Sequence, residues 1–275
     1  MLPLLLLAPL GTYPSNFALS FDAARRDVVR VPHEATMDGP LIDSWTIEAW
    51  VRPTEWQQPV TAGADGRVLN VVGFHGRHPS LGMTVDGHAV ARLWVDGGEW
   101  FTYEGSTRLT DGEWHHVAAT WSGSAEAAAD RKLSLYVDGE LEPAVGPDDD
   151  GRGQPKRPEY NDGGVAPHRP AARCTGAMCE EGMQIGGFYC CGGGGYTGSF
   201  FNGTIDEVRV WTTPVPQADI RARMRSPLDP SLANLLFYFA LDEAGMEQGA
   251  NVIESRALPW FGMLGNSQGA GRPKW

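Results

Sequence analysis

The first candidate for chemistry in this chain is a carboxylate, Asp206, which lies in an apolar stretch of sequence. In the stretch 204–211, strand alternation puts Asp206 on the same face as Val208 and Val210. If the valines face a core, Asp206 faces it too, and an unpaired buried charge is costly. Either a metal ion or a set of backbone N–H donors must therefore compensate Asp206. The residues alone leave both alternatives open.

The four cysteines are the next reactive groups, and they lie within 18 residues of each other in a glycine-rich patch. An even number in one patch predicts local disulfides. A bond between neighbouring cysteines is strained, so Cys190 and Cys191 are expected to bond separately, to Cys174 and Cys179 in either order. A zinc site with His168 and free thiols are the alternatives, although zinc ligands usually occur as C-x2-4-C pairs. Disulfides would favour a secretory or extracellular compartment.

One N-x-[ST] sequon occurs, Asn202-Gly203-Thr204. If the protein follows a eukaryotic secretory route, Asn202 is predicted to carry a glycan. Such triplets also occur by chance, which is the alternative.

Patterns typical of enzymes are missing from the sequence. Adjacent strand residues project to opposite faces, so His115 and His116 are not expected to share a metal ion, and we assign them structural roles. There is no E-x-D-x-E strand to place two carboxylates about 5 Å apart for glycoside hydrolysis. There is also no G-x-S-x-G, and the glycine run 192–195 lacks the lysine of a phosphate-binding loop. The sequence predicts that the protein is not an enzyme.

Aromatic side chains offer a binding chemistry instead. Several fall on outward or strand-edge positions, where they could stack on sugar rings. The alternative is burial between sheets, since an error of one residue in register reverses every assignment. The predicted stacking residues are Trp50, Trp94, Trp100 and Tyr136, with Tyr103 as a further candidate.

Strands must position these groups, because the dominant hydrophobic period is two. Alternation predicts half-buried strands over 44–51, 114–121, 132–138 and 234–241. Three Val-Asp-Gly triplets, at 85–87, 95–97 and 137–139, predict tight turns between antiparallel strands. A single short helix is expected over 217–225, after two prolines.

Composition narrows the classes of partner. The chain has 275 residues with 22 Lys+Arg and 34 Asp+Glu, and the resulting net charge of −12 argues against nucleic acid or anionic membranes. With 35 Gly and 20 Pro, it is rich in turns. The apolar segment 1–10 resembles a secretory signal core, although no basic residue precedes it, so segment 1–16 is either a signal or a retained segment. No stretch approaches the ~18 apolar residues of a transmembrane helix.

We expect one domain over 17–245, interrupted by a long inserted loop over 144–198. Segment 146–173 has almost no apolar residue and carries an acidic triplet, Asp148 to Asp150, that we interpret as a solvated loop. Segment 246–275 is expected to complete the domain as a strand and tail.

Five ordered motifs resemble laminin-G-like domains. They are the opening pair ALSFD and 28–32, WTIEAWV at 45–51, DGEWHHV at 111–117 with 133–139, FNGTIDEVRVW at 201–211, and the late strand 236–243. The chain is similar to this branch of the concanavalin A-like jelly rolls, close to pentraxins. The resemblance implies an all-β sandwich of two antiparallel sheets, with one face free for a ligand.

The resemblance also bears on calcium. Related folds hold a structural Ca²⁺ with the aspartate matching Asp206 and carbonyl groups near the first strand, which implies a Ca²⁺ site at Asp206 and Asp22. The pentraxin pair of ligand-binding calcium ions is not expected, because segment 188–195 has no acidic residue. The resulting expectation is a non-catalytic, secreted or cell-surface module that binds glycan or an extracellular protein. The alternative is a structural subunit of an extracellular assembly, with self-association through segment 1–16 and the Cys/Gly loop.

Overall fold

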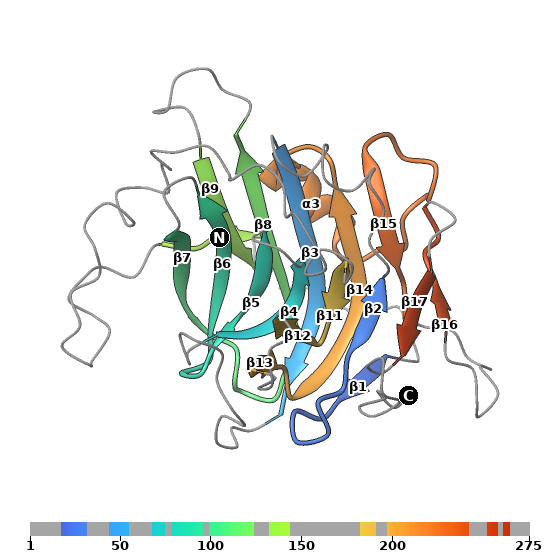
Figure 1. Cartoon of the computed structure of the whole chain (residues 1–275). Helices are drawn as coiled ribbons and strands as arrows, with labels where there is room; N and C mark the ends of the chain where they lie inside the picture. The colour runs from blue at the N-terminus through green and yellow to red at the C-terminus, as the bar shows by residue number, and fades with distance from the viewer. Residues whose placement is uncertain are drawn as a thin grey trace, which may run out of the picture.

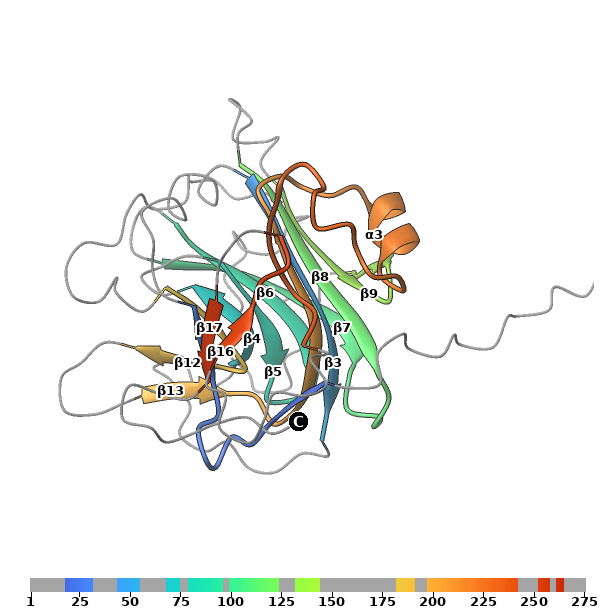
Figure 2. The same cartoon turned by 90° about the vertical axis from the view of Figure 1, so that its right-hand side faces the viewer.

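The computed structural model describes residues 18–31, 44–54, 68–74, 79–95, 99–123, 132–143, 182–190, 197–241, 252–257 and 261–264. More than half of them lie in strands of two antiparallel sheets that face each other (Figures 1 and 2). The predicted all-β sandwich is therefore confirmed.

The first sheet, sheet A, has seven strands within the described residues. Its central strand β3 carries the predicted WTIEAWV motif and pairs with β14 on one side and β8 on the other. In spatial order the strands are β1 (Leu19–Phe21), β14 (Gly203–Trp211), β3 (Ser44–Pro53), β8 (His115–Ser122), β9 (Lys132–Val137) and β10 (Glu140–Leu141), with β15 (Leu235–Phe239) also paired to β14.

The second sheet, sheet B, has eight strands within the described residues. Strand β2 from the start of the chain lies between β17 and β11, which come from much later in the sequence (Figure 1). In spatial order the strands are β16 (Val252–Glu254), β17 (Phe261–Leu264), β2 (Val29–Val31), β11 (Met183–Ile185), β4 (Val68–Phe74), β5 (Ser80–Thr84), β6 (His88–Val95) and β7 (Glu99–Arg108).

The predicted loop over 144–198 requires a correction. Residues Met183–Ile185 form β11, which pairs with both β2 and β4 inside sheet B. Strands β12 (Gly187–Cys190) and β13 (Thr197–Phe200) then form a separate two-stranded sheet. Three residues are too few for an alternating pattern to be recognised, which is why the sequence suggested a loop. The acidic triplet and segment 1–16 lie outside the described residues.

The core lies between the two sheets and comes from alternate residues of each strand. Trp45, Ile47, Ala49 and Val51 of β3 are all fully buried in it. The opposite residues of β3 face a second, smaller apolar cluster on the far side of sheet A. That cluster includes Val215 and Ile220, which belong to the segment and helix after β14.

Helix α3 (Gln217–Arg223) covers this far side of sheet A (Figure 2). Pro216 stands at its N-cap, Asp219 lies in its first turn, and Arg221 and Arg223 lie in its last turn. This charge order complements the helix dipole. The predicted helix is confirmed, two residues shorter than expected at its C-terminal end.

Candidate functional site

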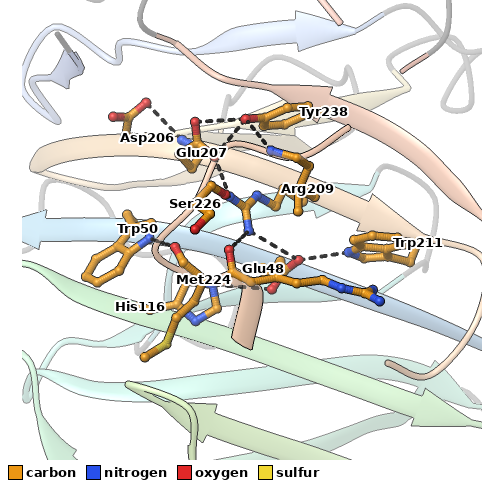
Figure 3. A network of polar contacts seen from close by, with 12 residues as sticks. Glu48, Trp50, His116, Asp206, Glu207, Arg209, Trp211, Met224, Ser226 and Tyr238 are labelled. Carbon is orange, nitrogen blue, oxygen red and sulfur yellow. Dashed lines mark hydrogen bonds and ion pairs between the residues drawn. The ribbon is translucent and has the colours of Figure 1, made fainter. Parts of the chain in front are cut away.

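The outer face of sheet A, which points away from sheet B, carries a buried network of charged side chains (Figure 3). Alternation in β3, β8 and β14 brings Glu48, His116 and Arg209 onto this face. All three are at most 2% exposed, because α3 and the residues after it lie over them. An isolated charge at such a position is very unfavourable, so the network must compensate itself.

Arg209 is the centre of the network. Its Nη2 donates to a carboxylate oxygen of Glu207 and to the carbonyl of Ser226 at 2.8 Å, and its Nη1 donates to the carbonyl of Arg223 at 3.1 Å. Trp50 adds a third such bond, from Nε1 to the carbonyl of Met224 at 2.7 Å. The last carbonyls of a helix have no partner within the helix. Side chains of sheet A therefore cap the C-terminal end of α3.

The carboxylate of Glu48 balances the positive charge of Arg209 from the side opposite Glu207. One carboxylate oxygen accepts from Trp211 Nε1 at 2.8 Å and lies 4.0 Å from Arg209 Nη1, and the other lies 3.3 Å from His116 Nε2. Burial alone would raise the pKa of Glu48, but the hydrogen bond and charge of His116, with Arg209 and Trp211, hold it below its ordinary value. Glu48 is therefore the ionised partner of the buried Arg209 guanidinium.

Tyr238 closes the network at Glu207. Its hydroxyl donates to the Glu207 carboxylate at 3.0 Å and accepts from the N–H of Leu228 at 3.3 Å. Burial, followed by the charge of Glu207, raises the pKa of Tyr238 to about 12. The network thus holds the segment over sheet A in place, and its groups are too deeply buried to meet a substrate.

Asp206 is buried, as predicted, but on the other face. Its register partner is Trp50, on the outer face of sheet A, and the register between β14 and β3 shifts just after it. Glu207 takes a φ of +51°, which forms a β-bulge and reverses the alternation before Val208. The Asp206 carboxylate accepts the N–H of Glu207 at 2.9 Å. A backbone donor, the second alternative above, is therefore present.

The structure does not bring Asp22 and Asp206 together. Along β14, Phe21 pairs with Gly203, so Asp22 follows at the opposite end of this ladder from Asp206. Asp22 instead accepts the N–H of Ala24 at 2.9 Å in the turn between β1 and β2. Within the described ranges, no group of three or more His, Cys, Asp or Glu side chains could hold a metal ion. These two aspartates do not fit a shared Ca²⁺, and calcium binding stays a prediction.

The aromatic residues also require a correction. Trp50 is 5% exposed and Tyr136 is 9% exposed, because both lie on the outer face of sheet A beneath the cover of α3. Tyr103 lies in the main core and donates its hydroxyl to the carbonyl of Glu142 at 2.6 Å. These three are not available for stacking on a sugar.

Trp94 and Trp100 remain candidates. They are register partners in β6 and β7, two residues beyond the pair Arg92 and Thr102. Their side chains lie outside what the structure describes.

The modification sites are partly described. The Asn202 amide donates from Nδ2 to Thr54 Oγ1 at 2.6 Å, so its side chain already has a partner within the fold. Glycosylation there stays a prediction. Cys174, Cys179 and Cys191 fall outside the described residues, and Cys190 is described only in its backbone, so disulfide formation also stays a prediction.

Sheet B carries a row of mostly polar residues on its outer face, the face away from sheet A, with a glycine within it. Successive register pairs cross six strands from β2 to β7. We call these residues the polar row: Arg30, Gln184, Gly73, Ser80, Arg92 and Thr102. Their strand neighbours, such as Val29, Leu81 and Leu93, point into the main core instead. The row therefore supplies hydrogen-bonding groups on one face of the sheet.

The middle of the polar row is shielded and its ends are more open. Gln184 is 0%, Ser80 6% and Arg92 7% exposed, whereas Arg30 and Thr102 are partly exposed. A molecule binding to this face would thus meet the ends of the row first. The sequence carried a signal for the row, because Ser80, Gly82 and Thr84 alternate with Leu81 and Met83. A stretch of five residues does not by itself distinguish a strand from a short buried helical segment.

The chain is similar to a known protein family and to several solved structures. Residues 24–180 match the Laminin_G_3 family, described as the concanavalin A-like lectin/glucanases superfamily. No curated protein matches the chain.

Among solved structures, a candidate carbohydrate-binding protein from Bacteroides ovatus is 18% identical with a TM-score of 0.60, and the match covers 92% of this chain and 58% of that one. The chain therefore spans little more than half the length of that protein. Domains LG4-5 of mouse laminin alpha1 are 16% identical, with a TM-score of 0.41 and 77% and 48% of the two chains covered.

A heptameric SAP-like pentraxin from Limulus polyphemus is 13% identical, with a TM-score of 0.38 and 77% and 76% of the two chains covered. The pentraxin likeness is thus a distant one. None of the helical segments in the described part of the chain has the length and hydrophobicity needed to span a bilayer.

Proposed function

Because this chain belongs to the concanavalin A-like lectin/glucanases superfamily, we propose that it is a non-catalytic domain that binds carbohydrate. The fold alone does not give a function, so the proposal must rest on a site. The Bacteroides ovatus protein with the same fold, described as a candidate carbohydrate-binding protein, is consistent with it.

The polar row of sheet B carries the proposal. Sugar hydroxyls need side chains that donate and accept hydrogen bonds, and the partly exposed ends of the row offer the guanidinium of Arg30 and the hydroxyl of Thr102. The register places Trp94 and Trp100 next to its β6–β7 end. A polar row with an adjacent pair of tryptophans is the combination that sugar recognition uses, hydrogen bonds with stacking.

The carboxylates support the non-catalytic part. Hydrolysis of a glycoside uses two carboxyl groups that both reach the substrate. In sheet A, Glu48 and Glu207 are 2% and 3% exposed and are engaged by Trp211, Arg209 and Tyr238. We further propose that the domain lies outside the cell, because the clustered cysteines suit an oxidising compartment if they form disulfides.

A glycan array with the whole chain tests the proposal. We expect binding to one class of glycan, and a loss of about fivefold in affinity for Trp100→Ala or Thr102→Ala, since the loss of a contact that contributes about 1 kcal/mol is about fivefold. Arg225→Ala is the matched control, because Arg225 is exposed on the opposite side of the molecule, over Trp50. Circular dichroism must show that all three variants fold.

Two results would overturn the proposal. The first is the absence of binding to any glycan by folded protein. The second is binding that Trp100→Ala, Thr102→Ala and Arg225→Ala weaken equally, which would move the site away from sheet B. Large particles in light scattering, together with no glycan bound, would instead favour a structural subunit.

A further inference from the structure

His115 lies between two carboxylates at the start of β8. Its Nδ1 is 2.9 Å from Asp138 Oδ2, and its Nε2 is 3.1 Å from Asp111 Oδ1. The imidazole is 12% exposed, whereas Asp111 and Asp138 are 52% and 40% exposed. We call these three residues the His115 cluster.

The cluster joins two segments that are distant in the sequence. Asp111 precedes β8 and also accepts the N–H of Glu113 at 2.9 Å. Asp138 begins the turn between β9 and β10, where its second oxygen accepts the N–H of His116 at 2.9 Å. The N–H of Asp138 donates in return to the carbonyl of His116 at 2.7 Å. The two contacts with His116 join the turn to β8 without the imidazole. The imidazole of His115 adds a third link and also connects the turn to the segment before β8.

The same turn also anchors α3. The carbonyl of Gly139 accepts from Arg221 Nε at 3.0 Å and from Gln217 Nε2 at 2.9 Å, both on the helix. Arg221 also pairs with Glu140. The turn over residues 138–140 is therefore held from one side by His115 and from the other by α3.

The geometry of the cluster requires a charged imidazole. A neutral imidazole has one N–H, so it can donate to only one carboxylate and turns a lone pair toward the other. An imidazolium donates from both nitrogens. The other charged groups nearby do not supply this charge, because His116 points to Glu48 on the outer face and Arg221 pairs with Glu140. Glu113, in the segment before β8, is acidic, and the guanidinium of Arg52 on β3 lies over the ring of Trp114, 5.2 Å from its centroid.

We propose that protonation of His115 is a pH-dependent lock, which holds the turn over residues 138–140, and with it the anchorage of α3, to the start of β8. The lock is closed in mildly acidic solution and is released as the solution becomes alkaline. This inference does not depend on the ligand of sheet B.

The pH range in which the lock is closed follows from the pKa values of His115, Asp111 and Asp138. The hydrogen bond to Asp138, opposed by burial, raises the pKa of His115 above its ordinary 6.5. Its stabilisation is fully present below 6.5 and is lost as the pH rises through the raised value. The backbone bond from Glu113 and the bond from His115 lower the pKa of Asp111 below 3.8. Burial alone would raise the pKa of Asp138, but hydrogen bonds from His115 and from the N–H of His116 lower it below 3.8. The lock is therefore closed between about pH 4 and 6.5.

Two measurements on the whole chain test the lock. The first is an NMR titration of His115, whose midpoint we expect above the 6.5 of an unperturbed histidine. The second is urea unfolding of wild type and His115→Gln at pH 5.5 and 8.5. At pH 5.5 the equilibrium constant for folding of the variant should be about tenfold lower than that of the wild type. This is the lower end of the range for a hydrogen bond to a charged group, because both aspartates are partly exposed. At pH 8.5 the loss should be smaller.

His88→Gln is the matched control, since His88 faces one carboxylate, Glu104, at 3.5 Å in sheet B. Its effect on stability should change less between the two pH values than that of His115→Gln. Amide hydrogen exchange at His116, corrected for the intrinsic rate, should slow at the acidic pH in the wild type. A His115 midpoint at or below the 6.5 of an unperturbed histidine overturns the proposal, and this measurement needs only the wild type. A stability difference that is the same at both pH values does so as well.

Discussion

Replacement of Arg209 by methionine gives the sharpest test of how sheet A holds α3. Methionine keeps much of the length of the side chain and removes the guanidinium. The change leaves Glu207 and Glu48, which are 3% and 2% exposed, without their shared cation. It also removes the donors to the carbonyls of Arg223 and Ser226 at the end of α3.

The expected loss of unfolding free energy is about 3–5 kcal/mol, the cost of removing one partner from a buried ion pair. The two lost bonds to carbonyls add little to this loss, because the carbonyl of Arg223 also accepts the N–H of Ser226, and Ser226 is exposed to water. For comparison, a domain has about 5–15 kcal/mol in total. The variant should therefore be partly unfolded well before the wild type in a denaturant series.

Urea unfolding at pH 7, followed by circular dichroism, measures this loss. Arg225→Met is the control, because Arg225 is exposed and only lies over the Trp50 ring, at 5.9 Å. A cation–π contact at an exposed site contributes about 0.5–1 kcal/mol. The control should thus lose less than about 1 kcal/mol.

A triple variant separates the loss of charge balance from the loss of packing. Adding Glu48→Gln and Glu207→Gln to Arg209→Met removes the uncompensated charges, so part of the stability should return. The reasoning is refuted if Arg209→Met costs less than about 1 kcal/mol, or if the triple variant is less stable than the single one.

Three further predictions concern packing and pH. Gly186→Ala should lower the melting temperature more than Gly112→Ala. Both glycines take positive φ (+80° and +86°), but only at Gly186 would a Cβ meet Phe21, at 2.0 Å. Equal losses would contradict a tight contact between Gly186 and Phe21. Glu142→Ala should cost about 2 kcal/mol in urea unfolding, because it strands two backbone N–H groups of β7 and the Thr107 hydroxyl; an unchanged midpoint would count against this. Burial raises the pKa of Tyr238 from 10 to about 12, so the free energy of unfolding should fall as the pH rises through this interval. Tyr238→Phe should remove that part of the fall, which unfolding curves at alkaline pH measure.

The sandwich could be predicted because its strands obey local rules. Alternation in β3, β8 and β9 reports a half-buried face directly, and each is observed within a residue or two of its predicted bounds. The turn at 137–139 was predictable for a similar reason, since Asp138 and Gly139 take φ of +51° and +79°, as a tight hairpin requires.

The errors arise where tertiary structure overrides the local pattern. Glu207 adopts a left-handed conformation that no residue type announces, and the resulting bulge moves Asp206 to the other face. Trp50 and Tyr136 do point outward, but α3 returns over them from more than 80 residues later in the chain. Neither effect can be obtained from alternation within one strand.

The placement of the first two strands has a consequence for synthesis. Strand β1 pairs with residues 203–205, and β2 is inserted between residues 183–185 and 263–264. At about 5–20 residues per second, a ribosome exposes β2 roughly 10–50 s before its last partner is made. During that interval these strands have unpaired edges, which are prone to association with other chains. The two sheets can therefore be completed only after nearly the whole chain has been translated, and the yield of folded protein should depend on chaperones that protect its first strands.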